Sequence, residues 1–300
     1  MDNMLKFMIS QYEGLPVSQS TLNRWLKHWI YNQEAKQIDN SFSARFPWKE
    51  MSLPQSYFLQ RKLCIDGQFF LTGPRFLGGD INQPFVDIVA SSAAVNDFVL
   101  QEISKEWVEL KPKHIRQLTP GKRPDMGVVD QLVYAAPLNH DPKYFDDAIT
   151  LASAVRQDFD WCRQAVIEAY KHSWSTTPAL VGSLYPIDEA DLLDHIIKGN
   201  TYLINHMGNR LGLIVCEERE LSFLNGIFIL EEIILPAFRG SSFASRAQRL
   251  LQNHLYQLSG KDCLIAGTII PENYPSIRTA EKAGRTCVLK YEFLTSYGFS

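Results

Sequence analysis

The chain has 300 residues, enough for one large domain or two of ordinary size. Its apolar fraction of 45% and charged fraction of 21% are typical of a globular protein that folds in water. A net charge of −3 gives no electrostatic basis for binding nucleic acid. No apolar run approaches the length of a membrane span, and the first residues lack the apolar segment of a signal peptide. We therefore expect a cytoplasmic protein with no nucleic-acid and no membrane partner.

The cysteines are scattered and form no Cys-x-x-Cys pair. There are five of them: Cys64, Cys162, Cys216, Cys263 and Cys287. Such spacing indicates neither a zinc site nor a disulfide framework, so no metal is expected. The sequence does not indicate an oligomeric state.

The first half of the chain mixes helical and extended patterns. Apolar residues recur at helical spacing over 18–33, after polar residues that can cap a helix. Short extended runs separated by glycine-containing turns then predict antiparallel strands, followed by a helix and two further strands. The predicted elements are strands 58–65, 68–71 and 84–90, helix 95–110, and strands 114–118 and 131–136.

A polar stretch at 139–144 predicts a boundary, so residues 1–140 and 145–300 are expected to form two domains. The second half again mixes strands and helices. Its predicted elements are strand 148–155, helices 159–172 and 188–198, strands 201–206, 211–216 and 229–235, helix 243–258, strand 263–270, helix 274–283 and strand 286–294. This order predicts an α+β fold: a mainly antiparallel sheet with flanking helices, in which one helix connects two parallel strands.

The segment from Ile227 to Ala244 predicts an anion-binding site. A run rich in β-branched residues reads as a buried strand that ends at Pro236. The turn Arg239–Ser242 follows, and a helical pattern begins at Phe243. Unpaired amides and the dipole of a helix start both favour a phosphate group, and Arg239 adds a full positive charge.

Two motifs in this half resemble those of a known enzyme family. Arg239-Gly240-Ser241-Ser242-Phe243-Ala244 matches the cofactor loop R/Q-x-x-G-x-G/A at its first and last positions. The segment 273–284 follows the form Asn-x-x-Ser-x-Arg-x-x-Glu-Lys-x-Gly. Over about residues 147 to 295 the chain therefore resembles the GNAT superfamily of acyl-CoA-dependent N-acetyltransferases. The second motif is most similar to the branch that acetylates ribosomal-protein N-termini.

The resemblance implies acetyl-CoA as cofactor, with its pantetheine arm between the parting strands 229–235 and 263–270. The arm would pair with the free strand edge like an added strand. The pyrophosphate would lie on the amides of residues 240–244, flanked by Arg239. Asn273 would bond the pantetheine amides and could also cap the following helix; Ser276 would contact the ligand or support the first helical turn. The implied cofactor contacts are Ile234, Leu235, Arg239, Gly240, Ser241, Ser242, Phe243, Ala244, Asn273 and Ser276.

The catalytic groups are less clearly defined. Strand alternation points either Glu231 or Glu232 toward the acceptor as a general base, and an ordinary ion-paired glutamate is an equal alternative. The resemblance implies an oxyanion donor at the backbone amide of Ile234 or Leu235. The tyrosine acid of many relatives is replaced by Ala280, which leaves the acid unidentified.

The resulting hypothesis is an N-acetyltransferase that moves an acetyl group to a primary amine by direct attack in a ternary complex. The amine would belong to a small molecule or a protein N-terminus. The alternative is a non-catalytic acyl-CoA-binding or sensing protein, because Ser242 replaces the usual central glycine and Ala280 the tyrosine. We also expect the two halves to be tandem copies of the fold, the first degenerate and without a pyrophosphate site.

Overall fold

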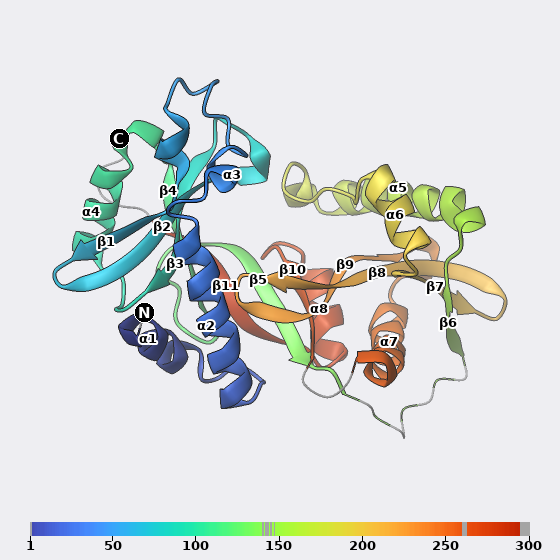
Figure 1. The fold of residues 1–300 in the computed structure, drawn as a ribbon. Helices are drawn as coiled ribbons and strands as arrows, with labels where there is room; N and C mark the ends of the chain where they lie inside the picture. The colour runs from blue at the N-terminus through green and yellow to red at the C-terminus, as the bar shows by residue number, and fades with distance from the viewer. Residues whose placement is uncertain are drawn as a thin grey trace. The chain divides into compact units, whose positions relative to one another are not determined.

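The computed structural model describes residues 2–139, 141, 144, 146, 148–259 and 263–294. The chain forms two compact units, coloured by residue number in Figure 1. Unit 1 comprises residues 1–131, 222–224 and 288–300, and unit 2 comprises 132–221 and 225–287. Within the described ranges, no helix combines the length and apolar character needed to cross a bilayer.

Unit 1 is built on a sheet with the strand order β1-β2-β3-β4-β11. The pair β3 and β4 is parallel and is connected through α4, whereas the other neighbours are antiparallel. The elements are α1 (Asp2–Tyr12), α2 (Gln19–Ala35), α3 (Asn40–Ser43), β1 (Arg61–Ile65), β2 (Gln68–Phe76), β3 (Pro84–Ser91), α4 (Asp97–Glu106), β4 (His114–Pro120) and β11 (Thr286–Leu294).

The core of unit 1 lies between α4 and the sheet. The inward stripe of α4 consists of Val99, Leu100 and Ile103, which pack with strand residues such as Ile115. The indole of Trp107 is fully buried there, and its Nε1–H donates to Thr72 Oγ1 at 2.9 Å. A buried donor without such a partner would cost free energy, so this bond fixes the orientation of the ring.

Unit 2 has the strand order β5-β10-β9-β8-β7-β6, with β9 and β10 parallel. Helix α7 connects these two parallel strands. The elements are β5 (Val128–Pro137), β6 (Ile149–Ser153), α5 (Phe159–Thr176), α6 (Glu189–Ile197), β7 (Thr201–His206), β8 (Asn209–Leu221), β9 (Leu224–Ile234), α7 (Phe243–Ser259), β10 (Leu264–Ile269) and α8 (Tyr274–Lys282). Strand β5 begins in unit 1 and continues into unit 2 from residue 132.

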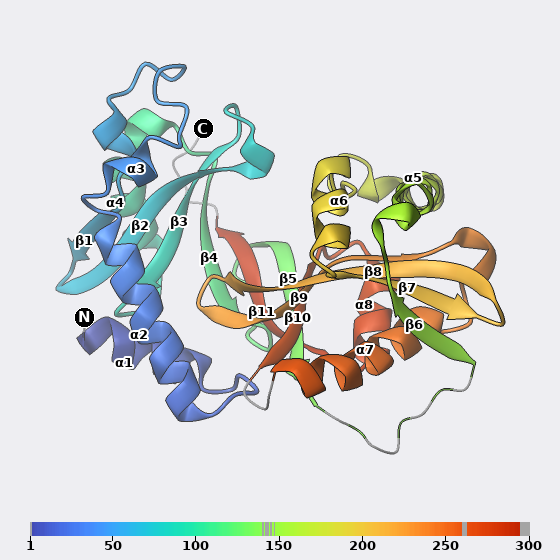
Figure 2. The ribbon, with the colours of Figure 1, turned by 45° about the vertical axis from the view of Figure 1, so that its right-hand side comes forward.

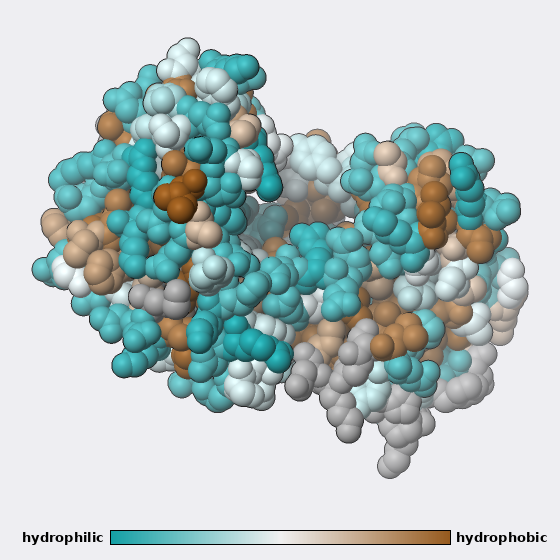
Figure 3. Space-filling model, viewed as in Figure 1, coloured by the Kyte–Doolittle hydropathy of each residue, from teal (hydrophilic) through white to brown (hydrophobic). Residues whose placement is uncertain are grey.

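Helices cover both faces of the unit 2 sheet, α5 and α6 on one face and α7 and α8 on the other (Figures 1 and 2). Each face of the sheet has its own hydrophobic core, and successive residues of β7 point into different cores. Leu203 packs with α5 and α6, and Ile204 packs with α7. This period of two is the signature of a strand buried on both faces. Most charged side chains lie at the surface, with buried exceptions such as Glu231 and Arg285, and teal surface predominates on the face in Figure 3.

The predicted mixed, mainly antiparallel sheet with flanking helices is confirmed, as are the main helices and strands. The helix α1 was not predicted. The compact units differ from the predicted halves 1–140 and 145–300, because the C-terminal strand β11 pairs with β4 in unit 1 and most of β5 pairs with β10 in unit 2. Part of the predicted boundary loop 139–144 lies outside the described residues.

Candidate functional site

The parallel strands β9 and β10 pair only at their beginnings. Their ladder consists of Leu264 with Gly226, Ile265 with Ile227, and Ala266 with Phe228. Strand β9 then continues to residue 234 and β10 to residue 269 without further pairing to each other. The two strands therefore part as the resemblance implies, which leaves an edge of β9 that faces away from β8.

The backbone of β9 shows which groups point to that edge. The amide of Leu235 donates to Leu211 O of the neighbouring strand at 2.8 Å, so it is already used. Successive residues of a strand point their backbone groups in opposite directions, so Ile234 presents its N–H and C=O to the parted side. The candidate oxyanion donor, left open between these two residues by the sequence, is therefore Ile234.

The turn before α7 contains two residues with positive φ. Gly240 has φ of 87° and Ser242 has φ of 58°, both in the left-handed region. A serine in that conformation is strained by roughly 1–2 kcal/mol, and a glycine is not. Ser242 thus adopts the conformation of the glycine it replaces, and its side chain is exposed rather than turned into the helix.

The start of α7 is open to an anion. The first helical backbone bond runs from the Arg246 amide to Ser242 O at 3.1 Å. In the described part of the chain, nothing accepts from the amides of Phe243, Ala244 and Ser245, and the first turn has no acidic residue. Three free amides and the positive end of the helix dipole are the features that an anion site at this turn requires, and the site itself stays a prediction.

The charge at this turn comes from Lys282, a lysine that was not among the predicted site residues. Lys282 Nζ, at the end of α8, donates to Ser242 Oγ at 3.1 Å. Arg239 lies differently from the expectation: its Nε donates to Ile234 O at 3.0 Å and its Nη2 to Ala169 O on α5 at 3.2 Å. Burial also lowers the pKa of Arg239. The Arg239 guanidinium therefore links β9 to α5. It also bonds the Ile234 carbonyl, which a pantetheine arm would need as a hydrogen-bond acceptor.

Asn273 is the N-cap of α8, and its Oδ1 accepts from the Ser276 amide at 3.3 Å. The Asn273 side-chain nitrogen bonds no residue that the structure describes. The cap role and the ligand role are therefore compatible, since the cap uses only the oxygen.

Glu231 lies on the α5 and α6 face of β9 and is buried. Its carboxylate accepts from the hydroxyl of Tyr170 on α5 at 2.9 Å and from the Ile187 amide at 3.2 Å. Burial raises the pKa of Glu231 to about 7, more than these hydrogen bonds lower it. The Tyr170 hydroxyl also lies 3.0 Å from Tyr185 O, so it can donate there when Glu231 is protonated and donates to the hydroxyl oxygen of Tyr170. The pair is thus built to hold a proton near neutral pH.

Glu232 points to the opposite face, toward α7. Its Oε2 accepts from Gln248 Nε2 at 2.7 Å, and Gln248 Oε1 accepts from Arg285 Nε at 3.1 Å. Glu232 Oε1 is buried and has no hydrogen-bond partner in the described residues. Burial raises the pKa of Glu232, whereas the charge of Arg285 lowers it.

The Arg285 side chain lies next to the point where β9 and β10 stop pairing. A Cβ on Gly267, the first β10 residue beyond the ladder, would lie 3.0 Å from Arg285 Nη1 and 3.2 Å from Ile229 O. Neither Arg285 nor Gln248 nor Tyr170 was among the predicted site residues. The available signal was a set of polar residues at helical spacing beside the apolar stripe of α7, Ser245, Gln248 and Gln252, all of which are buried.

Ala280, at the position where the sequence resemblance implies a tyrosine acid, is part of the hydrophobic core. Ala280 is fully buried and packs with Tyr134 and Ile269. Tyr274, the tyrosine of α8, is 65% exposed, and Tyr291 of β11 belongs to unit 1. The structure therefore brings no phenol of α8 toward the thioester site. No group of three or more His, Cys, Asp or Glu is placed to hold a metal in the described ranges.

Solved structures of similar arrangement carry the family name given by the motifs. A GCN5-related N-acetyltransferase from Sphaerobacter thermophilus is similar at 14% identity and a TM-score of 0.47, over 76% of this chain and 78% of that one. A GNAT-family acetyltransferase from Colwellia psychrerythraea is similar at 12% identity and a TM-score of 0.46, over 75% and 85%. The diaminobutyrate acetyltransferase EctA from Paenibacillus lautus, solved with its substrate and coenzyme A, is similar at 15% identity and a TM-score of 0.31, over 44% and 71%.

No known family profile matches the sequence, and no curated protein matches it.

Proposed function

We propose that unit 2 is an acetyl-CoA-dependent N-acetyltransferase that acts on a primary amine. The observation that carries the proposal is the combination of a parted parallel strand pair with an open helix start at the end of the same strand. The parted edge offers backbone groups to an extended arm, and the amides of residues 243–245 suit a diphosphate. When bound, acetyl-CoA supplies the thioester carbonyl that the amine attacks directly.

The residues that would hold the cofactor are those at the strand edge, the turn and the start of α8. Ile234 offers its amide to the arm or to a developing oxyanion, and Asn273 offers its free side-chain nitrogen. Lys282 places a cation at the turn in addition to the helix dipole. For the Ile234 carbonyl to pair with the arm, Arg239 must release it, and Arg239 keeps its contact with Ala169 on α5.

Glu231 is the proposed general base, and Tyr170 is its positioning residue. An amine acceptor must lose a proton on acylation, and a buried carboxylate with a pKa of about 7 can take it, directly or through a water. Tyr170 and the Ile187 amide hold the carboxylate in one orientation. Glu232 is assigned a structural role instead, because Gln248 fixes it on the α7 face.

Unit 1 is proposed to be a degenerate copy of the same arrangement. It repeats a parallel pair connected by a helix, β3–α4–β4, and that pair also parts after four residue pairs. The start of α4 is closed, however: Asn96 Oδ1 accepts from the Val99 amide at 2.9 Å, and Asp97 places a negative charge in the first turn. A phosphate is disfavoured there, so the cofactor is assigned to unit 2 alone.

The test combines binding and turnover. Calorimetric titration with acetyl-CoA should show binding, and thiol release should follow with at least one amine of a panel of amino acids, polyamines, lysine peptides and peptides with free N-termini. Peptides from ribosomal-protein N-termini belong in the panel because of the α8 motif. A protein that binds acetyl-CoA tightly and turns over no amine would be the non-catalytic sensor, which the absence of a phenol at Ala280 favours. A protein that does not bind acetyl-CoA at all would contradict both functions.

A further inference from the structure

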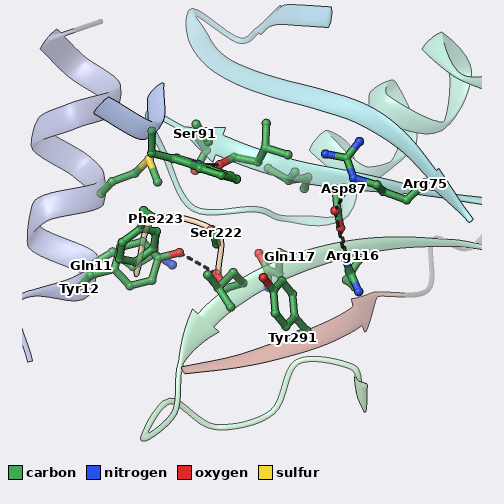
Figure 4. A pocket seen from close by; sticks show the side chains of 16 residues that line it. Gln11, Tyr12, Arg75, Asp87, Ser91, Arg116, Gln117, Ser222, Phe223 and Tyr291 are labelled. Carbon is green, nitrogen blue, oxygen red and sulfur yellow. Dashed lines mark hydrogen bonds and ion pairs between the residues drawn. The ribbon is translucent and has the colours of Figure 1, made fainter. Parts of the chain in front are cut away.

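Unit 1 contains a partly open cavity where β3 and β4 part. The ladder between these strands ends at Ile88 and Gln117, and the strands continue separately to residues 91 and 120. The cavity has a volume of about 200 Å³ and lies beside the last turn of α1 and the middle of α2 at Trp29. Figure 4 shows the side chains that line it.

The strand edges in this cavity are already capped by side chains. Trp29 Nε1–H of α2 donates to Val89 O at 2.8 Å, and the Tyr12 hydroxyl of α1 donates to Leu118 O at 2.8 Å. The Phe223 ring packs on Tyr12 with 4.7 Å between ring centroids. An extended arm cannot pair with carbonyls that are occupied in this way. The remaining volume is below the roughly 300–1,000 Å³ of sites for drug-sized ligands, so an occupant must be small.

The charged side chains at one end of the cavity form ion pairs with one another. Arg116 donates to both oxygens of Asp87, at 2.7 and 3.1 Å, and to Asp130 at 2.9 Å. Arg75 Nε lies 3.3 Å from Asp87 Oδ2, and its Nη1 donates to Pro74 O. Both oxygens of Asp87 are thus taken, whereas Arg75 Nη2 has no acceptor among the residues that the structure describes. This end therefore has a spare cationic donor and no spare carboxylate.

The middle of the cavity adds hydrogen-bond donors. In Figure 4 the Tyr291 ring rises from β11 beside Gln117, with its hydroxyl toward the centre of the pocket. Burial raises the pKa of Tyr291 to about 12, so the phenol is protonated at neutral pH and can donate a hydrogen bond to a ligand. The hydroxyl bonds no described residue, and neither does that of Ser91 across the cavity. Unsatisfied donors beside an arginine are suited to an anionic acceptor.

The opposite end is aromatic, so the two ends differ in chemistry. Figure 4 places Tyr12 and Phe223 at one end and Arg75, Asp87 and Arg116 at the other. We propose that this cavity binds a small organic carboxylate, with its carboxylate on Arg75 and Tyr291 and its apolar body on the rings of Tyr12, Phe223 and Trp29. An ammonium ligand is disfavoured, because the negative charge of Asp87 is already paired with two guanidinium groups, those of Arg116 and Arg75. The site is independent of the acetyl-CoA site proposed in unit 2.

The test uses the full-length protein and ligand-observed saturation-transfer NMR. The probes are benzoate and phenylacetate, each compared with its neutral amide, and every titration is repeated with acetyl-CoA at saturation. The carboxylates should bind and the amides should bind at least about tenfold more weakly, as expected for loss of a hydrogen bond to a charged group. Acetyl-CoA should not displace them, which separates this site from the one in unit 2.

Two variants locate the site. Tyr291→Phe keeps the ring and removes only the hydroxyl, and it should weaken benzoate binding about tenfold. Arg75→Gln should weaken it further, whereas Lys105→Gln, an exposed cation on α4, should leave it unchanged. Circular dichroism and thermal unfolding check that each variant is folded, and an unfolded Arg75 variant leaves Tyr291→Phe to decide. Equal binding of acids and amides, binding unaffected by Tyr291→Phe, or no binding of either acid would each overturn the proposal.

Discussion

Replacing Glu231 with glutamine tests the buried proton site of unit 2. The pKa of Glu231 is raised from an ordinary value of 4.5 to about 7, chiefly by burial. Because folding raises this pKa, the protonated carboxyl stabilises the folded chain. That contribution is complete below a pH of about 4.5 and is lost as the pH rises through about 7. The shift corresponds to about 3 kcal/mol between these limits.

Glutamine has nearly the same shape but no proton to lose, so Glu231→Gln should remove this part of the pH dependence. The free energy of unfolding of both proteins would be measured by urea denaturation between pH 5 and 8. The variant should gain stability relative to the natural chain as the pH rises, by about 3 kcal/mol in total. Glu218→Gln, an exposed glutamate of β8, is the matched control and should show no such trend. A stability difference between Glu231→Gln and the natural chain that is the same at every pH would refute the reasoning.

Further predictions concern the site and the fold. The kcat/KM for acetyl transfer should increase as the pH rises through about 7, since Glu231 must be ionised to act as the base. Glu231→Gln should abolish this increase. Tyr170→Phe should move the increase to higher pH, because the Tyr170 hydroxyl stabilises the ionised carboxylate of Glu231. Lys282→Gln should weaken calorimetric binding of CoA about two- to fivefold and leave pantetheine binding unchanged, whereas Arg239→Ala, which acts at the Ile234 carbonyl, should alter both by the same factor. Gly212→Ala should destabilise unit 2 by about 3 kcal/mol or more in urea denaturation, because its Cβ would lie 1.8 Å from Ile233 O; Gly14→Ala, with nothing within 4 Å, should be near neutral.

Periodicity was enough to place the elements of unit 2, because each is a local pattern. The stripe of α7 and the β-branched run of β9 lie where the sequence indicates. The turn between them could also be predicted, since Gly240 and a following helix start form a short-range signal. The helix α1 was missed because further apolar residues, Leu5, Phe7 and Ile9, stand between its buried residues Met4, Met8 and Tyr12 and obscure the helical spacing.

What could not be predicted depends on contacts between distant residues. The Tyr170 and Glu231 side chains meet across 61 positions of sequence, and Arg285 reaches Gln248 across 37. The direction of a long side chain is equally hidden: Arg239 lies in the cofactor motif but bonds α5, whereas Lys282 reaches the turn from α8. Strand β11 pairs with β4, and β5 pairs with β10. The hydrophobic pattern of a strand does not specify which other strand it pairs with, so these pairings could not be predicted.

The most direct test of the central claim is a crystal structure of the protein grown with acetyl-CoA. The account predicts electron density for the pantetheine arm along the β9 edge at Ile234, with the diphosphate on the amides of Phe243 and Ala244. It also predicts that the Arg239 side chain has left the Ile234 carbonyl. Density for the cofactor anywhere else, or a ladder between β9 and β10 that closes fully in its presence, would contradict the account.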